Sequence, residues 1–130
     1  MLPIIVTAAV IRQEDGVLIT KRPENSRHGG RWEFPGGKLD PGESPQDGLR
    51  RELREELGIE IEVGNILEVV YHRYPQATVL ILAYNCKHLR GEIRNLEVAE
   101  HRWVTTSDLQ RYALLEADAP IVARLLEVAP

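Results

Sequence analysis

Residues Gly37–Ile59 read GKLDPGESPQDGLRRELREELGI and are the most informative part of the chain. Ser44 followed by Pro45 predicts the start of a helix, because a serine side chain caps unpaired amide groups and proline suits the first helical position. Asp47 adds a negative charge to the first turn, where the helix dipole favours it. Gly58 predicts the helix end, since glycine readily adopts the left-handed conformation of a C-terminal cap. The stretch therefore predicts one capped helix between two loops.

The predicted helix is amphipathic. Leu49, Leu53 and its last residue, Leu57, lie four positions apart and follow one face. Charged residues occupy the rest of its surface. We expect the leucine face to pack into the core.

Three carboxylates share another face of this helix. Glu52, Glu55 and Glu56 stand at positions i, i+3 and i+4, which places them within one turn. Such close charges repel one another, but clustered oxygens hold a hard divalent cation such as Mg2+ and leave coordination sites for water and phosphate. The alternative is a solvated acidic face in which Arg51 and Glu55 form an ion pair.

The flanking residues favour the metal-binding interpretation. They complete the spacing GX5EX7REUXEEXGU, in which U is a bulky aliphatic residue. From average composition, a chance match in one window is on the order of 10^-10. The residues that fill the pattern are Gly37, Glu43, Arg51, Glu52, Leu53, Glu55, Glu56, Gly58 and Ile59. This pattern is the Nudix box, here residues 37–59, and on it the chain resembles the Nudix hydrolase family without any departure.

The resemblance implies a loop-helix-loop that binds a divalent metal and hydrolyses a nucleoside diphosphate linked to another group. The implied cofactor is Mg2+, with Mn2+ as a substitute. By position, the implied metal ligands and catalytic residues are Glu52, Glu55 and Glu56, and which of them is the general base stays open. Gly36 becomes a ligand through its main-chain carbonyl, since glycine allows backbone conformations closed to other residues. Arg51 would support catalysis by pairing with Glu43 and orienting the carboxylate face.

The remaining elements predict a mixed α/β fold. Apolar, β-branched runs and a Trp-Val pair predict strands at 4–11, 17–19, 61–71, 78–84 and 103–104, and an apolar helical pattern follows residue 118. Asp15-Gly16 predicts a hairpin between the first two strands. Because strands and helices do not alternate regularly, we expect a mixed β-sheet sandwiched between helices, an α/β/α arrangement. The length fits a single domain over residues 1–130.

The composition excludes several kinds of partner. Sixteen Lys and Arg against 20 Asp and Glu give a net charge of -4, which argues against long nucleic acids and anionic membranes. No apolar stretch approaches the ~20 residues that a membrane span requires. Cys86 is the single cysteine, and no leader pattern opens the chain, so a cytoplasmic location is expected. We expect a monomer or homodimer that binds a small nucleotide.

Beyond the box the chain is similar to the MutT-like branch, whose members cleave nucleoside triphosphates to the monophosphate and pyrophosphate. Arg22 falls at the phosphate-binding arginine of that branch, and a guanidinium suits phosphate; the alternative is the solvated end of a strand. Glu33, Phe34, Pro35 and Gly36 fall where the branch shapes the nucleotide pocket. Phe34 is equally compatible with an ordinary core residue.

Other candidates carry weaker signals. A further metal ligand in this branch precedes a Trp-Val strand, and of Glu97 and Glu100 we favour Glu100, which opens Glu-His-Arg-Trp; the alternative is a surface carboxylate. Arg27 and His28 lie in a polar loop, where solvated side chains are the favoured interpretation over substrate contacts. His72 would pack in the fold or line a base pocket.

Asp118 stands where members specialised for 8-oxoguanine nucleotides often have asparagine. An amide both donates and accepts hydrogen bonds, whereas an ionised aspartate only accepts. Asp118 would therefore suit the amino group of cytosine, unless burial keeps it protonated. It is also a good N-cap for the last helix.

These residues together predict a Mg2+-dependent nucleoside triphosphate pyrophosphohydrolase. The leading substrate is an oxidised nucleotide such as 8-oxo-dGTP, which implies nucleotide-pool sanitation and a role in DNA repair. The alternative substrate is CTP or a 5-substituted pyrimidine triphosphate. A nucleotide-sensing module without catalysis is a third hypothesis, against which the intact glutamates argue.

Overall fold

The structure is a computed structural model that describes residues 2–128. Its strands are β1 (Ile4–Gln13), β2 (Gly16–Lys21), β3 (Trp32–Glu33), β4 (Gly36–Lys38), β5 (Glu60–Arg73), β6 (Thr78–Arg90) and β7 (Glu100–Thr105). Its helices are α1 (Pro45–Leu57) and α2 (Ala119–Val128), preceded by the 3-10 helices η1 (Thr106–Arg111) and η2 (Glu116–Asp118). Neither α1 nor α2 combines the length and the apolar character needed to cross a membrane.

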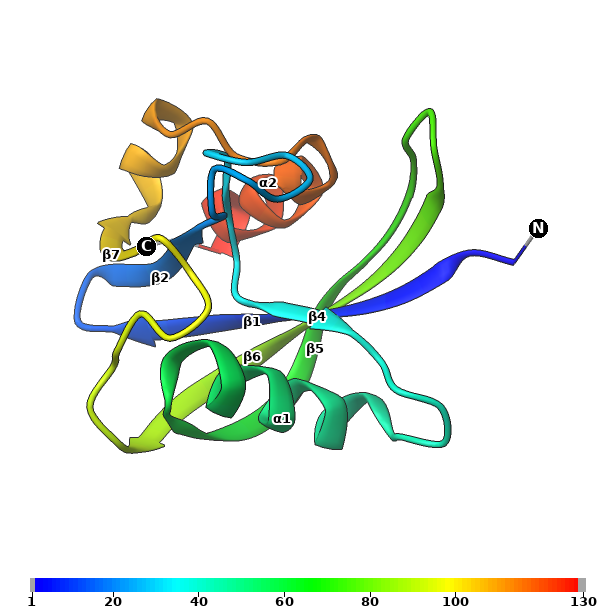
Figure 1. Ribbon diagram of the computed structural model, residues 1–130. Helices are drawn as coiled ribbons and strands as arrows, with labels where there is room; N and C mark the ends of the chain where they lie inside the picture. Colours follow the sequence, from blue (N-terminus) through cyan, green and yellow to red (C-terminus); the bar gives the residue numbers. More distant parts are fainter. Residues whose placement is uncertain (1, 129–130) are drawn as a thin grey trace.

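The sheet is mixed, as predicted. Its main order is β3-β2-β1-β6-β5, with β4 paired to β1 and β7 paired to β2. Strands β1 and β6 run parallel from Ile4 opposite Val79 to Ile11 opposite Cys86, and the other pairs are antiparallel. Helices α1 and α2 lie on opposite sides of β1 in Figure 1. The predicted sandwich of a sheet between helices is therefore confirmed.

Strand β1 supplies side chains to two cores. Successive residues of a strand point to opposite faces of the sheet. Ala9 and Ile11 consequently pack in the cluster that contains the leucines of α1, whereas Ala8 and Val10 pack in the cluster that contains α2. The central strand thus links both layers.

Helix α1 begins and ends as the sequence predicts. The Ser44 hydroxyl accepts a hydrogen bond from the amide of Asp47 at 3.1 Å, and Gly58 adopts the left-handed conformation with φ of 69°. The three leucines of its apolar face are completely buried. Local capping and core packing therefore fix this helix against the sheet.

Two features differ from the sequence prediction. The short strands β3 and β4 were not expected, because two or three residues become a strand only by pairing with β2 and β1. In the first hairpin, Gln13 pairs with Gly16, so the turn residues are Glu14 and Asp15, and the positive φ of 55° falls on Glu14. The hairpin is confirmed, but Gly16 belongs to β2.

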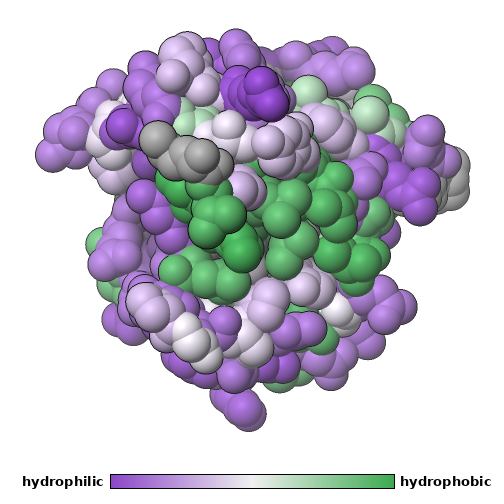
Figure 2. Space-filling model, turned by 90° about the vertical axis from the view of Figure 1, so that its right-hand side faces the viewer, coloured by the Kyte–Doolittle hydropathy of each residue, from purple (hydrophilic) through white to green (hydrophobic). Residues whose placement is uncertain are grey.

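Part of the sheet face extends into solvent. Figure 2 shows an apolar area on the side of the molecule where β1 starts. Ile5 pairs with Leu80, and Leu80 pairs with Tyr71 across the sheet. Ile5 and Tyr71 are exposed, as is Val69. The apolar face of the sheet that α1 covers therefore extends past the helix, where its side chains are exposed to solvent.

The packing of α1 predicts a large effect of truncating Leu53. Its side chain is fully buried, so Leu53→Ala should lower the free energy of unfolding by about 2–5 kcal/mol through lost burial and the cavity that remains. Urea denaturation of the two proteins measures the difference. Leu126→Ala, on the other helix at a side chain that is 37% exposed, should cost much less; equal losses would contradict this assignment of the core.

Candidate active site

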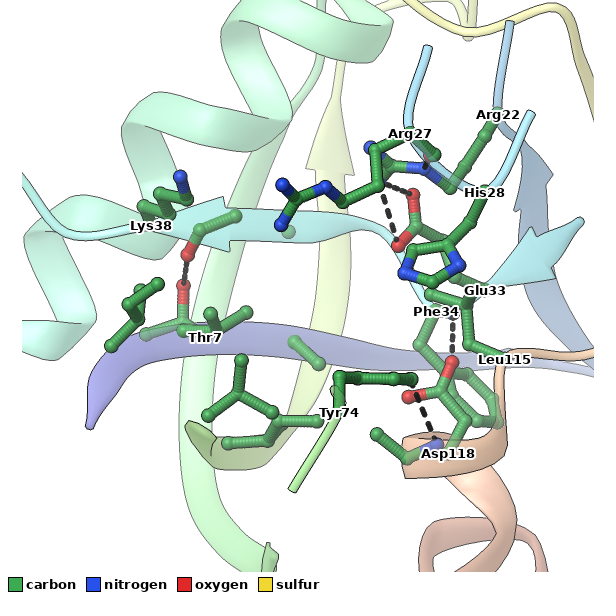
Figure 3. Close-up of a pocket in the computed structure, with 18 of the residues that line it drawn as sticks. Thr7, Arg22, Arg27, His28, Glu33, Phe34, Lys38, Tyr74, Leu115 and Asp118 are labelled. Atoms are coloured by element: carbon green, nitrogen blue, oxygen red, sulfur yellow. Dashed lines mark hydrogen bonds and ion pairs between the residues drawn. The ribbon is translucent and has the colours of Figure 1, made fainter. Parts of the chain in front are cut away.

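A cavity of about 350 Å³ opens on the face of β1 opposite α1. Its walls come from β1, β4 and β6, from the loop after β2, and from the chain around η2. Figure 3 shows these segments converging on it. Clefts of this size commonly hold small organic ligands.

One end of the cavity is apolar and is closed by Asp118. The Phe34 ring is buried, and its amide donates a hydrogen bond of 3.4 Å to Oδ2 of Asp118. Asp118 is only 4% exposed, and burial raises its pKa well above the ordinary value, with the charge of Glu33 adding to the rise. This carboxyl group therefore holds a proton more tightly than an exposed aspartate does. Its observed hydrogen bond joins it to the chain before β4 rather than capping α2.

The rings of His28 and Tyr74 line another wall of the cavity, and His72 packs against Tyr74 without lining the cavity. The Tyr74 ring lies between His28 and His72, with ring centroids 5.0 and 4.5 Å apart. Its hydroxyl accepts a hydrogen bond of 3.2 Å from the amide of Ala117. Tyr74 thus connects the β5–β6 hairpin to the loop after β2 and to η2.

Arg22 and Glu33, which are both predicted substrate contacts, line the cavity, and they bind each other. Arg22 Nη1 lies 3.1 Å from Oε2 of Glu33, and its Nε donates to the carbonyl of Arg27 at 2.7 Å. Burial raises the pKa of Glu33, and the positive charge of Arg22 opposes this rise. The Arg22 guanidinium is therefore already held by protein groups.

Arg51 lies at the centre of the carboxylate face. Its guanidinium binds both oxygens of Glu43 at 2.8 and 3.1 Å, which confirms the predicted pair between loop and helix. The same group donates to Glu52 at 2.9 Å, to Glu55 at 3.1 Å and to the carbonyl of Lys38 at 3.0 Å. These bonds lower the pKa of Glu43 and raise that of Arg51. One cation thus joins the loop, α1 and β4.

Glu52 and Glu56 are the more buried acids of this face. Burial raises the pKa of both, and the charges of Glu33, Glu52 and Glu97 raise that of Glu56 further, while the main-chain N–H of Gly36 opposes the rise. A Cβ on Gly37 would come within 2.5 Å of Oε2 of Glu52. Only glycine therefore lets this carboxylate lie against β4, beside the cavity.

The donor set suits a hard cation. All the candidate groups are carboxylate or carbonyl oxygens, which Mg2+ prefers, and a divalent charge would relieve the repulsion that raises the pKa of Glu56. Within residues 2–128, no three His, Cys, Asp or Glu side chains are already arranged as a metal-binding group. Glu52 and Glu55 instead direct oxygens toward Arg51. The residue types fit a divalent metal, and their oxygens must turn to surround one.

The two outer candidates lie in different surroundings. Glu97 adds its charge to the environment of Glu56, and its amide donates to the Glu56 carbonyl at 3.2 Å. The Glu100 carboxylate binds Arg102 at 2.9 Å on β7. The structure therefore places Glu97, rather than the favoured Glu100, against the carboxylate face.

Of the other predicted pocket residues, some line the cavity and one does not. Phe34, Gly36 and Asp118 line the cavity, whereas Pro35 is not among its lining residues and its carbonyl accepts a bond from the amide of Ala9 at 2.7 Å. Sequence reasoning missed the strand residues of the wall, most of which are apolar, together with Lys38. The missed strand residues are Ile4, Val6, Thr7, Ala8, Val79 and Ile81. No local signal marks them, because ordinary strand patterning accounts for each one.

Comparisons with known proteins identify the family of the chain. Residues 1–125 match the NUDIX domain. The chain is 37% identical over 120 residues to the CTP pyrophosphohydrolase of Escherichia coli, covering 90% of this chain and 87% of the relative. It is 36% identical over 122 residues to the 8-oxo-dGTP diphosphatase of Haemophilus influenzae, covering 93% and 90%. The crystal structure of a MutT protein from Methanosarcina mazei superposes with a TM-score of 0.87 at 31% identity, covering 96% of this chain and 94% of that one.

The family match spans nearly the whole chain, and the two relatives are similar over most of their own length. Within the box, the Glu52 carboxylate lies against Gly37 of the cavity wall, and Arg51 binds Glu43, Glu52 and Glu55. The chain therefore belongs to the Nudix hydrolase family and is a pyrophosphohydrolase that acts on phosphoric anhydride bonds.

Proposed function

We propose that residues 1–130 act as one domain, a Mg2+-dependent enzyme that converts nucleoside or deoxynucleoside triphosphates to the monophosphate and pyrophosphate in the cytoplasm. The leading substrate is an oxidised nucleotide such as 8-oxo-dGTP, whose removal cleans the nucleotide pool. The observation that carries this proposal is the polarity of the cavity. An apolar end closed by Asp118 suits a base, and the opposite side borders Gly37 and the carboxylate of Glu52.

The proposed metal ligands are the carboxylates of Glu52, Glu55 and Glu56 and the carbonyl of Gly36, with Glu97 replacing Glu100 as the outer ligand. When bound, Mg2+, or Mn2+ in its place, supplies a Lewis acid for phosphate oxygens and lowers the pKa of water. Arg51 orients Glu52 and Glu55 through its hydrogen bonds.

Glu56 is the favoured general base of the proposed mechanism. Before a metal binds, burial is the largest cause of the raised pKa of Glu56 and the neighbouring carboxylates add to it, so its carboxylate holds a proton more tightly than an exposed glutamate does. A base whose pKa approaches the working pH accepts a proton from water effectively. Glu56 would take the proton as the water oxygen attacks phosphorus, and the P–O bond of the bridge between the α- and β-phosphates would break to release the monophosphate and pyrophosphate.

The protonation of Asp118 bears on the choice of base. One of its oxygens accepts the amide of Phe34, and a protonated carboxyl group offers a donor at the other oxygen. Asp118 then presents a donor and an acceptor as asparagine does, which supports 8-oxoguanine as the leading base. The E. coli relative named a CTP pyrophosphohydrolase favours the second candidate, CTP or a 5-substituted pyrimidine triphosphate.

The proposed role of Glu56 predicts that Glu56→Gln lowers kcat for pyrophosphate release about 10²–10⁴-fold, because glutamine cannot accept the proton. Pyrophosphate released from 8-oxo-dGTP with Mg2+ measures the effect, and chromatography identifies the monophosphate. The matched control is Glu62→Gln, an exposed glutamate of β5, which should retain wild-type kcat. Wild-type turnover in Glu56→Gln would contradict the proposed base.

The proposed hydrogen-bonding role of Asp118 predicts that Asp118→Asn keeps the ratio of kcat/KM for 8-oxo-dGTP over CTP within about threefold, because an amide offers the same donor and acceptor. A steady-state comparison of the two substrates measures the ratio. If an ionised Asp118 reads the cytosine amino group, loss of that charged contact should shift the ratio at least about tenfold against CTP. That shift would favour the second candidate.

The burial of Asp118 also predicts a pH dependence of stability. Its pKa in the folded state is raised above the ordinary 3.8, so the folded protein binds this proton more tightly than the unfolded chain does. This contribution to stability is complete below the unfolded pKa and is lost as the pH rises through the folded pKa. Asparagine has no such proton, so the Tm of Asp118→Asn minus that of wild type should increase as the pH rises above 3.8.

Thermal unfolding monitored by circular dichroism across that pH range measures the difference. The other carboxyl groups whose pKa values are raised are present in both proteins, so the difference in Tm reports Asp118 together with its electrostatic coupling to Glu33. Asp15→Asn, at the exposed first turn, should give a flat difference. A flat difference for Asp118→Asn as well would contradict protonation of Asp118 in the fold.

A further inference from the structure

Three cationic side chains line the cavity, and they differ in what they bind. These are Arg22, Arg27 and Lys38. The Arg22 guanidinium contacts Glu33 through Nη1 at 3.1 Å and the carbonyl of Arg27 through Nε at 2.7 Å. In the described part of the chain, the guanidinium of Arg27 takes part in no hydrogen bond or ion pair. Arg27 therefore keeps its full donor capacity for a ligand.

The loop that carries Arg27 is held on both sides of that residue. Before it, the Ser26 hydroxyl donates to the carbonyl of Pro23 at 2.6 Å. After it, His28 has a φ of 58°, and its ring packs against that of Tyr74 at an interplanar angle of 42° with ring centroids 5.0 Å apart. A positive φ is costly for a residue other than glycine and persists only where surrounding contacts maintain it. Contacts on both sides therefore hold the backbone of Arg27 in place.

The Arg27 side chain points toward the end of the cavity that is remote from the base site. Figure 3 shows it extending from the loop toward Lys38, away from Asp118. Lys38 belongs to β4 and directly follows Gly37, against which the Glu52 carboxylate lies. A nucleotide with its base at Asp118 would direct its outer phosphates to this end.

The two arginines are unequal candidates for a phosphate contact. A guanidinium binds phosphate through its planar set of N–H groups, which must be available. Two nitrogens of Arg22, Nε and Nη1, are bonded to the carbonyl of Arg27 and to Glu33, so a phosphate bound by the paired N–H groups of its guanidinium would compete with the partly buried carboxylate of Glu33, and an unpaired buried charge is unfavourable. Arg27 has no such bond to break.

We propose that Arg27 contacts the outer phosphates of the substrate and that Arg22, which the family resemblance would assign to phosphate, positions the loop that carries Arg27. The inference rests on the proposed function, because it takes a nucleoside triphosphate as the ligand. It adds a specificity-determining residue that the sequence motif does not contain.

Binding constants test this assignment. Isothermal titration calorimetry with Ca2+ in place of Mg2+ gives Kd values for the pairs 8-oxo-dGTP with 8-oxo-dGMP and CTP with CMP. Arg27→Gln should weaken triphosphate binding about tenfold and change monophosphate binding less than about twofold, because only the outer phosphates lose a partner. Arg27→Lys should recover part of the loss. The matched control is Arg12→Gln, an exposed arginine of β1, which should retain both constants.

A double-mutant cycle separates the two arginines. The quantity compared is the preference for the triphosphate over the monophosphate. If Arg22 acts through Arg27, Arg22→Gln lowers this preference when Arg27 is present. In the Arg27→Gln background, the same substitution changes the preference by less than about twofold. Equal effects in both backgrounds would assign the contact to Arg22 and overturn the proposal. If Arg22→Gln does not fold, Arg27→Gln decides alone, and an unchanged triphosphate preference in that variant would overturn the proposal.

Nucleotide binding and pyrophosphate release by the wild-type protein distinguish this inference from the proposed function. Wild type that binds the triphosphate in preference to the monophosphate, with the expected loss in Arg27→Gln, supports the inference even if Mg2+ yields no pyrophosphate. That absence of product would contradict the proposed function alone. Wild type without any triphosphate preference would overturn the inference.

Discussion

The site depends on the hydrogen bonds of a single guanidinium, that of Arg51. It binds Glu43 in the loop, Glu52 and Glu55 on α1, and the carbonyl of Lys38 on β4. Without this charge, the neighbouring carboxylates would repel one another and the loop would lose its bond to the helix. Arg51 therefore couples the geometry of the loop and β4 to the acidic face.

Strand β1 connects the two ends of the cavity. The Thr7 hydroxyl donates to the carbonyl of Gly37 at 3.3 Å, next to the acidic face, while Ala8 lies in the core that also contains Phe34. The base end is therefore built on the α2 layer and the acidic end on the α1 layer. A ligand that spans the cavity contacts both layers through the same strand.

Two acids with raised pKa values line this cavity, and a third belongs to the carboxylate face of α1. Glu33 belongs to β3, Glu56 to α1 and Asp118 to η2, and burial is the largest cause of the raised pKa of each one. Their charges also act on one another, because that of Glu33 raises the pKa of both Glu56 and Asp118. Protonation at one end of the cavity is thus linked electrostatically to protonation at the other.

The sequence by itself determined the elements whose causes are local. Ser44 and Gly58 cap α1 through groups a few residues away, and the leucine spacing sets its buried face, so the carboxylate cluster and the Glu43–Arg51 pair followed from the pattern. Only the tertiary structure decided which distant groups meet. The strands β3 and β4 exist through pairing, Glu97 rather than Glu100 lies beside Glu56, and Arg22 is bound by Glu33 while Arg27 is not. Such contacts depend on chain segments far apart in sequence, whose approach no local periodicity or motif encodes.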